Sequence, residues 1–262
     1  MCYLFVNENG AKINCRENYV AVSLHEEVMK KIPIENLEAI YLFSTVQITS
    51  QCVAECLKRG ISLSYFSKGG IYSGRLHSTT HVNVHRQRKQ ASLANTEFSL
   101  SWSKHIIQGK IHNQEIVLKR YARSTQIQVE DLIKGMRYSI HKINQCKNIS
   151  EVMGYEGSAA RFYFEGLSRM VIPTFAFKGR SKRPPKDEFN AMLSLGYSLL
   201  MNEIYGRVEN KGLHPYFGFL HNDKEKHPTL ASDLMEEWRA TKEKTGKSGG
   251  NDYEYSMCLF YM

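Results

Sequence analysis

A single glutamate, Glu156, stands among neighbours that are all apolar. The spacing of apolar residues over 149–171 predicts an α-helix. In that helix, the side chains three and four positions from Glu156 are Val152, Met153, Ala159 and Ala160. Burying a carboxylate without a partner costs several kcal/mol, so we expect Glu156 either to be protonated or to meet a cation that the fold brings to it.

The nature of that cation stays open at this point. Glu165 in the same predicted helix has Arg161 and Arg169 four residues away on either side, which is typical of an exposed acid. Glu156 has no such neighbour. Its partner is either a divalent metal ion or an Arg or Lys side chain from elsewhere in the fold.

Two histidines lie in the later segment 212–221. His214 and His221 are seven residues apart and would share a face if the segment were helical. Pro215 and Gly218 argue against a helix. We therefore interpret His214 as a loop residue, with contact to substrate or metal as the alternative.

Segment 228–239 predicts a helix that carries further acids. Thr229 is placed to cap it, and its apolar stripe consists of Leu230, Leu234 and Trp238. Asp233 and Glu236 lie three apart on the polar side, where acids are usually solvated. Helix geometry does not choose among Asp233, Glu236 and Glu237 as functional groups.

Three motifs follow one another along the chain: Met153-Gly154-Tyr155-Glu156-Gly157 with Ala159-Ala160-Arg161, Gly212-Leu213-His214-Pro215 with Gly218-Phe219-Leu220-His221, and Leu230-Ala231-Ser232-Asp233-Leu234-Met235-Glu236. In order and spacing they resemble the CRISPR-associated protein one family, the integrases of CRISPR spacer acquisition. The likeness extends over about residues 1–240.

The resemblance implies a metal-dependent DNA integrase and endonuclease. Carried onto this chain, the catalytic metal ligands would be Glu156, His221 and Glu236, with Asp233 as a supporting acid. It also implies a homodimer, formed through an N-terminal β domain, that works with CRISPR-associated protein two on double-stranded DNA, namely prespacer fragments and the repeat.

The residue types fit such chemistry. Carboxylates suit Mg²⁺ or Mn²⁺, and an imidazole ligand favours manganese somewhat. Such an ion acts as a Lewis acid on the scissile phosphodiester while the 3′-hydroxyl of the incoming fragment attacks, so no protein nucleophile is needed.

The elements that must position these groups fall into two regions. Residues 1–80 predict a small strand-rich domain, with one helix from Ser50 to Leu57 that ends at Arg59-Gly60. The predicted strands are Tyr3 to Val6, Tyr19 to Leu24, Leu37 to Phe43, Ile61 to Phe66 and Ile71 to Leu76.

Residues 81–240 predict a larger all-α domain, so the fold class is α+β. Besides segment 228–239, the predicted helices are Val82 to Ala122 with a break near Asn113, Glu130 to Cys146, Ile149 to Val171, and Asp187 to Val208. Gly212 is placed to end the last of these. Residues 241–262 depart from the family, and we interpret them as a shifted reading frame or a divergent end.

Positive charge points to a polyanionic partner. Lys and Arg number 35 against 26 Asp and Glu, a formal net charge of +9. Such runs are often only solvated faces, but on a DNA-binding protein they would contact phosphates. Segment 177–185 is predicted to be an exposed basic loop. The candidate DNA-binding residues are Arg75, Arg86, Arg88, Lys89, Arg161, Arg180, Lys182, Arg183 and Lys211.

Composition limits the location and the rival functions. No run is apolar enough for a membrane span, and we expect a cytoplasmic protein whose six cysteines are free thiols. One rival to the integrase is a non-catalytic, truncated scaffold that binds DNA. A second is a metal-dependent repair nuclease acting on branched DNA.

Overall fold

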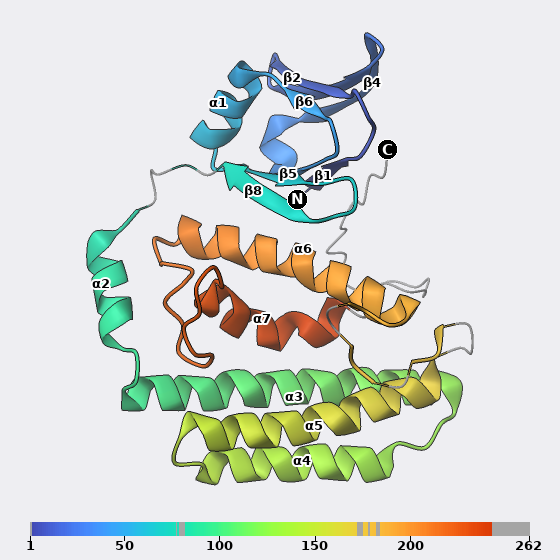
Figure 1. The fold of residues 1–262 in the computed structure, drawn as a ribbon, viewed down its shortest axis with the longest axis vertical. Coiled ribbons are helices and arrows are strands. Elements are labelled where there is room, and N and C mark those ends of the chain that lie inside the picture. The colour runs from blue at the N-terminus through green and yellow to red at the C-terminus, as the bar shows by residue number, and fades with distance from the viewer. Residues whose placement is uncertain are drawn as a thin grey trace. The chain divides into compact units, whose positions relative to one another are not determined.

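The computed structural model describes residues 2–76, 78, 82–171, 175–177, 179–181 and 184–242, with the side chains of 241 and 242 left out. The chain forms two compact units, one within Met1–Val82 and the other within Asn83–Ser248. Strands make up most of the first unit and helices the second (Figure 1). The predicted α+β class, with a strand-rich start followed by a helical region, is confirmed.

The first unit contains two four-stranded sheets. One has the order β1-β5-β7-β8, with bounds Cys2–Val6, Leu37–Phe43, Ser62–Phe66 and Tyr72–Leu76. The other has the order β4-β3-β2-β6, with bounds Glu27–Pro33, Tyr19–Leu24, Lys12–Arg16 and Gln47–Ile48. β1, β5 and β7 are mutually parallel, while β7 with β8, and β2 and β4 with β3, are antiparallel.

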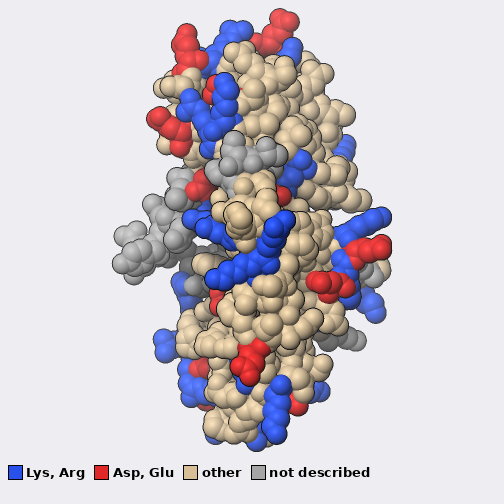
Figure 2. All heavy atoms as spheres, turned by 90° about the vertical axis from the view of Figure 1, so that its left-hand side faces the viewer, with Lys and Arg blue, Asp and Glu red and all other residues tan. Residues whose placement is uncertain are grey.

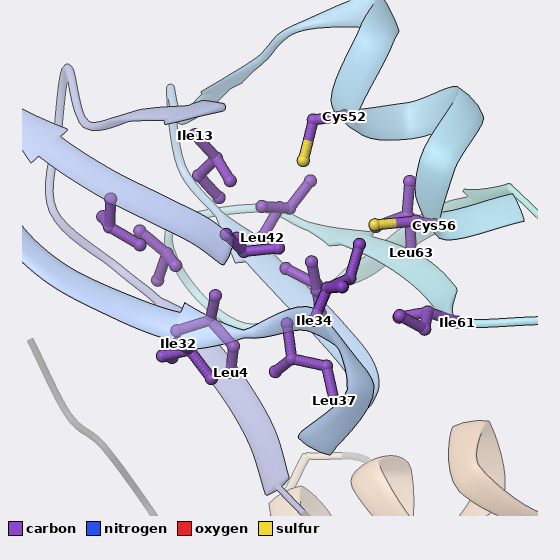
Figure 3. Packing of buried hydrophobic residues seen from close by; sticks show 14 of the residues in the cluster. Leu4, Ile13, Ile32, Ile34, Leu37, Leu42, Cys52, Cys56, Ile61 and Leu63 are labelled. Atoms are coloured by element: carbon purple, nitrogen blue, oxygen red, sulfur yellow. The ribbon is translucent and has the colours of Figure 1, made fainter. Parts of the chain in front are cut away.

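Apolar side chains from both sheets and from helix α1 (Ser50–Lys58) form one core (Figure 3). Cys52 and Cys56 of α1 point into it and are fully buried. α1 begins at Thr49, whose side chain accepts a hydrogen bond from Cys52 N at 3.3 Å, and the chain leaves it through Gly60 at φ +73°. Free thiols are confirmed for the five described cysteines, and Cys258 lies outside the described residues.

The second unit is built from six described helices. Their bounds are α2 Val84–Ser92, α3 Glu97–Thr125, α4 Glu130–Gln145, α5 Ile149–Met170, α6 Glu188–Asn210 and α7 Thr229–Lys242. The predicted break near Asn113 is wrong, because the chain bends between α2 and α3 instead. Asn113 lies in mid-α3, and its Nδ2 donates to the Glu237 carbonyl at 2.9 Å. Gly212, at φ +69°, follows α6 as expected.

α3 is the central element of the helical unit. It packs against α4, α5 and α7, and α6 packs against α7 (Figure 1). Ile107, Ile111 and Leu118 of α3 are completely buried in the shared core. α5 approaches closely because residue 166 is a glycine: a Cβ there would meet Leu118 at 2.8 Å.

Segment 177–185 differs from the predicted exposed loop where it is described. Phe177 is buried and stacks on Phe189, with ring centroids 4.3 Å apart. Lys182 and Arg183 lie outside the described residues, and so does the tail from residue 243 onward. Among the helices described, none combines the length and apolar character that a bilayer crossing requires.

Candidate functional site

Glu156 lies in the middle of α5 and faces the interior of the helical unit. α5 begins at Asn148, whose side chain accepts a hydrogen bond from Glu151 N at 2.9 Å. The Glu156 side chain is 16% exposed, whereas Glu165 on the same helix is 52% exposed and bonds Arg169 at 2.6 Å. The sequence correctly distinguished the enclosed acid from the exposed one.

The acids of α7 are more deeply buried than the sequence suggested. Asp233 is 0% and Glu236 3% exposed, so the expected solvated side of the helix is wrong. Trp238, expected in the apolar stripe, is instead exposed. Thr229 is the first residue of α7 rather than its cap, and its hydroxyl donates to the His227 carbonyl at 3.2 Å.

Asp233 organises the segment that carries His221. Its carboxylate accepts hydrogen bonds from three consecutive backbone N–H groups, those of Phe219 (2.7 Å), Leu220 (3.0 Å) and His221 (3.1 Å). The ring of His221 also donates from Nδ1 to Asp233 Oδ1 at 2.7 Å. This contact leaves Nε2 of His221 as the nitrogen available to a ligand.

The three residues implied as metal ligands come together. His221 Nε2 lies 3.7 Å from Glu236 Oε1. Lys110, on α3, places its ammonium between Glu156 and Glu236. The ammonium contacts Glu156 Oε1 and lies 2.7 Å from Glu236 Oε2. Arg239 Nη2 lies 3.0 Å from Glu236 Oε1. The site therefore consists of two carboxylates and an imidazole, with two basic side chains on the carboxylates.

Attraction between opposite charges keeps Lys110 and Glu236 ionised in this cluster of Lys110, Glu156, His221, Glu236 and Arg239. Burial alone would lower the pKa of Lys110, but the charges of Glu236 and Glu156 outweigh it and hold that pKa above its usual value. Burial alone would raise the pKa of Glu236, but the charges of Lys110 and Arg239 outweigh it and hold that pKa below its usual value. Both groups are ionised at neutral pH.

The donor set suits a hard divalent cation, but Lys110 stands in the way. Among the residues that the structure describes, no group of three or more His, Cys, Asp or Glu side chains is arranged to hold a metal ion as it stands. The Lys110 ammonium fills the space that an ion shared by Glu156 and Glu236 would need. The structure thus supplies the basic partner that was one of the two interpretations of Glu156, and it also brings His221 and Glu236 to the same place.

Lys110 was not singled out from the sequence, and the sequence carries only half of the signal that Glu156 shows. On α3 the neighbours three and four positions before Lys110 are Ile107 and Ile106, but those three and four positions after it are the polar Asn113 and Gln114. The helix pattern alone therefore does not mark Lys110 as enclosed. Pairing it with Glu156 would have required knowing that α3 packs on α5.

A cavity of about 610 Å³ opens beside the cluster. Lys110, Glu156, Arg161 and Arg239 line it, together with Tyr197 of α6. The guanidinium groups of Arg180 and Arg239 lie 5.4 and 5.2 Å from the centre of the Tyr197 ring. Burial raises the pKa of Tyr197, which therefore stays protonated at neutral pH. Basic side chains outnumber the acids in the lining, where Lys110, Arg161, Arg180 and Arg239 stand beside Glu156 and Glu165.

The predicted phosphate contacts Arg161 and Arg180 differ in their freedom. Arg161 is exposed at the rim of this cavity. Arg180 is half-buried: its Nη1 donates to Asn190 Oδ1 at 2.8 Å and its Nη2 to Ser194 Oγ at 3.1 Å. Burial also lowers the pKa of Arg180. These two hydrogen bonds occupy donors of Arg180 that would otherwise be available to a phosphate.

Helix α2 carries a second group of predicted DNA contacts. Arg88 and Lys89 are exposed on it, and Figure 2, which faces the side of α2, shows Lys and Arg side chains gathered there. Arg86 donates to the Lys211 carbonyl, so these two predicted contacts also lie together. Arg75 belongs to β8 in the first unit.

Gln90 fastens α2 to the segment that leads to His221. Its Nε2 donates to the carbonyls of His214 (2.8 Å) and Phe217 (2.7 Å), and its Oε1 accepts from His214 N at 2.8 Å. The His214 ring stacks on Phe217 with centroids 4.2 Å apart, and burial lowers its pKa. These contacts agree with the interpretation of His214 as a loop residue.

Comparison with known proteins agrees with this fold and these residues. The family model described as CRISPR associated protein Cas1 matches residues 4–243. A CRISPR-associated endonuclease Cas1 of Mycobacterium tuberculosis is 39% identical over 241 residues, which are 92% of this chain and 71% of that protein.

Solved structures show the same fold. A Cas6-RT-Cas1–Cas2 complex matches with a TM-score of 0.73 and 27% identity, over 92% of this chain and 27% of that one. A casposase bound to integration product matches with a TM-score of 0.76 and 21% identity, over 93% of this chain and 71% of that one. On the strength of the family match across nearly the whole described chain, this protein belongs to the CRISPR-associated Cas1 family.

Proposed function

We propose that this protein is a metal-dependent DNA endonuclease and integrase that joins the 3′-hydroxyl ends of short DNA fragments into a CRISPR repeat array. The observation that supports this most is the convergence of Glu156, His221 and Glu236. They come from three separate segments of the chain and meet beside a cavity whose lining includes Arg161, Arg180 and Arg239.

Glu156, His221 and Glu236 would hold the ion, Mg²⁺ or Mn²⁺, which when bound supplies Lewis-acid polarisation of a phosphodiester. Asp233 keeps the His221 ring in one orientation and one tautomer, with Nε2 directed toward Glu236. Arg239 holds Glu236 through its Oε1, so that carboxylate cannot turn away.

In the proposed reaction, the 3′-oxygen of the incoming fragment forms a bond to a phosphorus of the repeat, and the bond from that phosphorus to the repeat's own 3′-oxygen breaks. The proton of the attacking hydroxyl is balanced by the proton that the departing oxygen gains. Arg161 is placed to hold phosphates at the cavity, and Arg88 and Lys89 hold flanking DNA.

Similar solved structures support the choice of partners. One is a Cas6-RT-Cas1–Cas2 complex, and another is a casposase bound to an integration product. From these we expect Cas2 and double-stranded DNA as partners. We also propose a homodimer joined through the strand-rich unit, as the family resemblance implies, and a location in the cytoplasm.

The test is half-site integration of a short duplex with free 3′-hydroxyl ends into a plasmid that carries the repeat. Joining should require Mn²⁺ or Mg²⁺ and fall at least a hundredfold in Glu156→Gln, while DNA binding is retained. Glu151→Gln is the matched control, because Glu151 lies on the same helix but is exposed and bonds Lys147 N and Asn148 Nδ2 at the start of the helix. Joining without metal, or undiminished in Glu156→Gln, would refute the mechanism.

A non-catalytic scaffold is the second candidate, and the contact of Lys110 with both carboxylates favours it. A scaffold would bind DNA with no joining or cutting under any metal condition. Cutting of branched DNA without joining would instead identify a repair nuclease that uses the same residues.

A further inference from the structure

The ammonium of Lys110 holds together two carboxylates that would otherwise repel each other. It contacts Glu156 and lies 2.7 Å from Glu236 Oε2, and the residue is only 5% exposed. Two acids buried side by side resist being ionised together unless a positive charge lies between them. Lys110 supplies this charge in the metal-free protein.

A divalent ion shared by Glu156 and Glu236 would need the space that this ammonium fills. Two cations at such short range in a buried site repel strongly, because little water screens them. Arg239 does not occupy the same position: it binds the other oxygen of Glu236 and lies over the ring of Tyr197. Lys110 is therefore the cation that has to move.

The cavity beside the site can receive the displaced side chain. Lys110 and Glu156 both line it, and its volume of about 610 Å³ leaves room for an extended lysine. The flexible four-carbon stem of lysine allows the ammonium to turn while the backbone of α3 stays in place. In the cavity the ammonium would be a donor for a phosphate oxygen.

We propose that Lys110 is an exchangeable counter-cation: it occupies the shared position between Glu156 and Glu236 in the metal-free protein and yields it to the divalent ion. The inference rests on the proposed metal site. It makes metal binding an exchange of one cation for another, so the measured affinity includes the cost of displacing Lys110.

Replacing Lys110 by an uncharged side chain of similar length tests the exchange. We expect full-length Lys110→Met to bind Mn²⁺ at least tenfold more tightly than the unmodified protein, measured from the electron paramagnetic resonance signal of free Mn²⁺. Lys119→Met is the control, because Lys119 lies on the same helix but pairs with Glu115 away from the site. An unchanged or weaker Mn²⁺ affinity in folded Lys110→Met would overturn the exchange.

A second measurement keeps the native lysine, in case Lys110→Met does not fold. With ¹³Cε-labelled lysines, the Lys110 resonance is identified by its absence in Lys110→Arg, and saturating Mg²⁺ should shift it toward the position of exposed lysines. A resonance that Mg²⁺ leaves unmoved would refute the proposal.

Glu156→Gln distinguishes failure of the Lys110 exchange from failure of the proposed metal site. If this variant loses Mn²⁺ binding while Lys110→Met binds as the unmodified protein does, only the exchange is refuted. If Glu156→Gln binds Mn²⁺ as tightly as the unmodified protein, the metal site itself is refuted and the exchange falls with it.

Discussion

The Oδ1 atom of Asp233, a completely buried residue, lies 2.7 Å from Nδ1 of His221. The same carboxylate receives the backbone N–H groups of residues 219, 220 and 221. One side chain thus fixes both the path of this segment and the orientation of its histidine ring. Asp233 is accordingly a positioning residue, and we expect it to contribute strongly to the stability of the folded protein.

Asp233→Asn should lower the free energy of unfolding by about 3 kcal/mol. The asparagine amide has only one oxygen that can accept hydrogen bonds, and its NH₂ group would face other donors. Buried N–H groups would then lack an acceptor, and each such group costs about 1–3 kcal/mol. Urea unfolding measures the change. Asp131→Asn is the control, because Asp131 is 65% exposed and its removal should cost less than about 1 kcal/mol. Equal stability of the two variants would contradict this role.

Gly218→Ala should destabilise the protein by about 1–3 kcal/mol, because an added Cβ would lie 2.6 Å from Asp233 Oδ2 and 2.9 Å from the backbone of Thr229. Thermal unfolding compares it with Gly154→Ala. Residue 154 lies in α5 with no atom within 4 Å of an added Cβ, so alanine there should stabilise the helix by up to about 1 kcal/mol. The prediction fails if Gly218→Ala unfolds no earlier than the unmodified protein.

Glu115 should make α3–α4 packing sensitive to acid. Burial alone would raise its pKa, but hydrogen bonds from Arg137 (2.7 Å) and Lys119 (2.5 Å) outweigh burial and hold that pKa below its usual value. A pKa lowered by folding means that the stabilisation is present above the unfolded pKa, about 4.3, and is lost as pH falls through the lower folded pKa. Glu115→Gln should therefore be less stable than the unmodified protein at pH 7.

The difference in stability between Glu115→Gln and the unmodified protein should shrink as pH falls below about 4. Urea unfolding midpoints at a series of pH values would measure this difference. A gap that stays constant with pH would show that Glu115 contributes through packing alone.

Arg88→Ala combined with Lys89→Ala should flatten the dependence of DNA affinity on salt. Each lost phosphate contact reduces the slope of log affinity against log salt by about 0.9 for duplex DNA, so the double change should reduce it by about 2. Fluorescence anisotropy at several salt concentrations measures the slope. Lys134→Ala, at an exposed position of α4, is the control, and an equal effect there would exclude a specific role for α2.

Local patterns predicted most of the elements but not all of the strands. Runs such as Leu37 to Phe43 are apolar enough to identify a strand by themselves. Three strands had no predicted counterpart. β2 has one fully buried residue, Ile13, β4 has an exposed face that includes Glu27 and Lys31, and β6 is only two residues long. All three are defined by their pairing with other strands, which the spacing of apolar residues does not reveal.

The same limit applies to the site. Helical spacing singled out Glu156 as an enclosed acid, and the family motifs pointed to His221, Asp233 and Glu236. Lys110 escaped notice because its partners lie 46 and 126 residues along the chain. Which basic residue reaches an enclosed acid depends on how α3, α5 and α7 pack, and that is a property of the tertiary structure.

α7 lies far along the chain from the residues with which it forms the site, and this separation has a consequence during translation. α7 carries Asp233 and Glu236 and packs against α3. A ribosome adds Lys110 and Glu156 well before it adds these acids. The ammonium of Lys110 can therefore meet both carboxylates only after the segment that forms α7 has been synthesised.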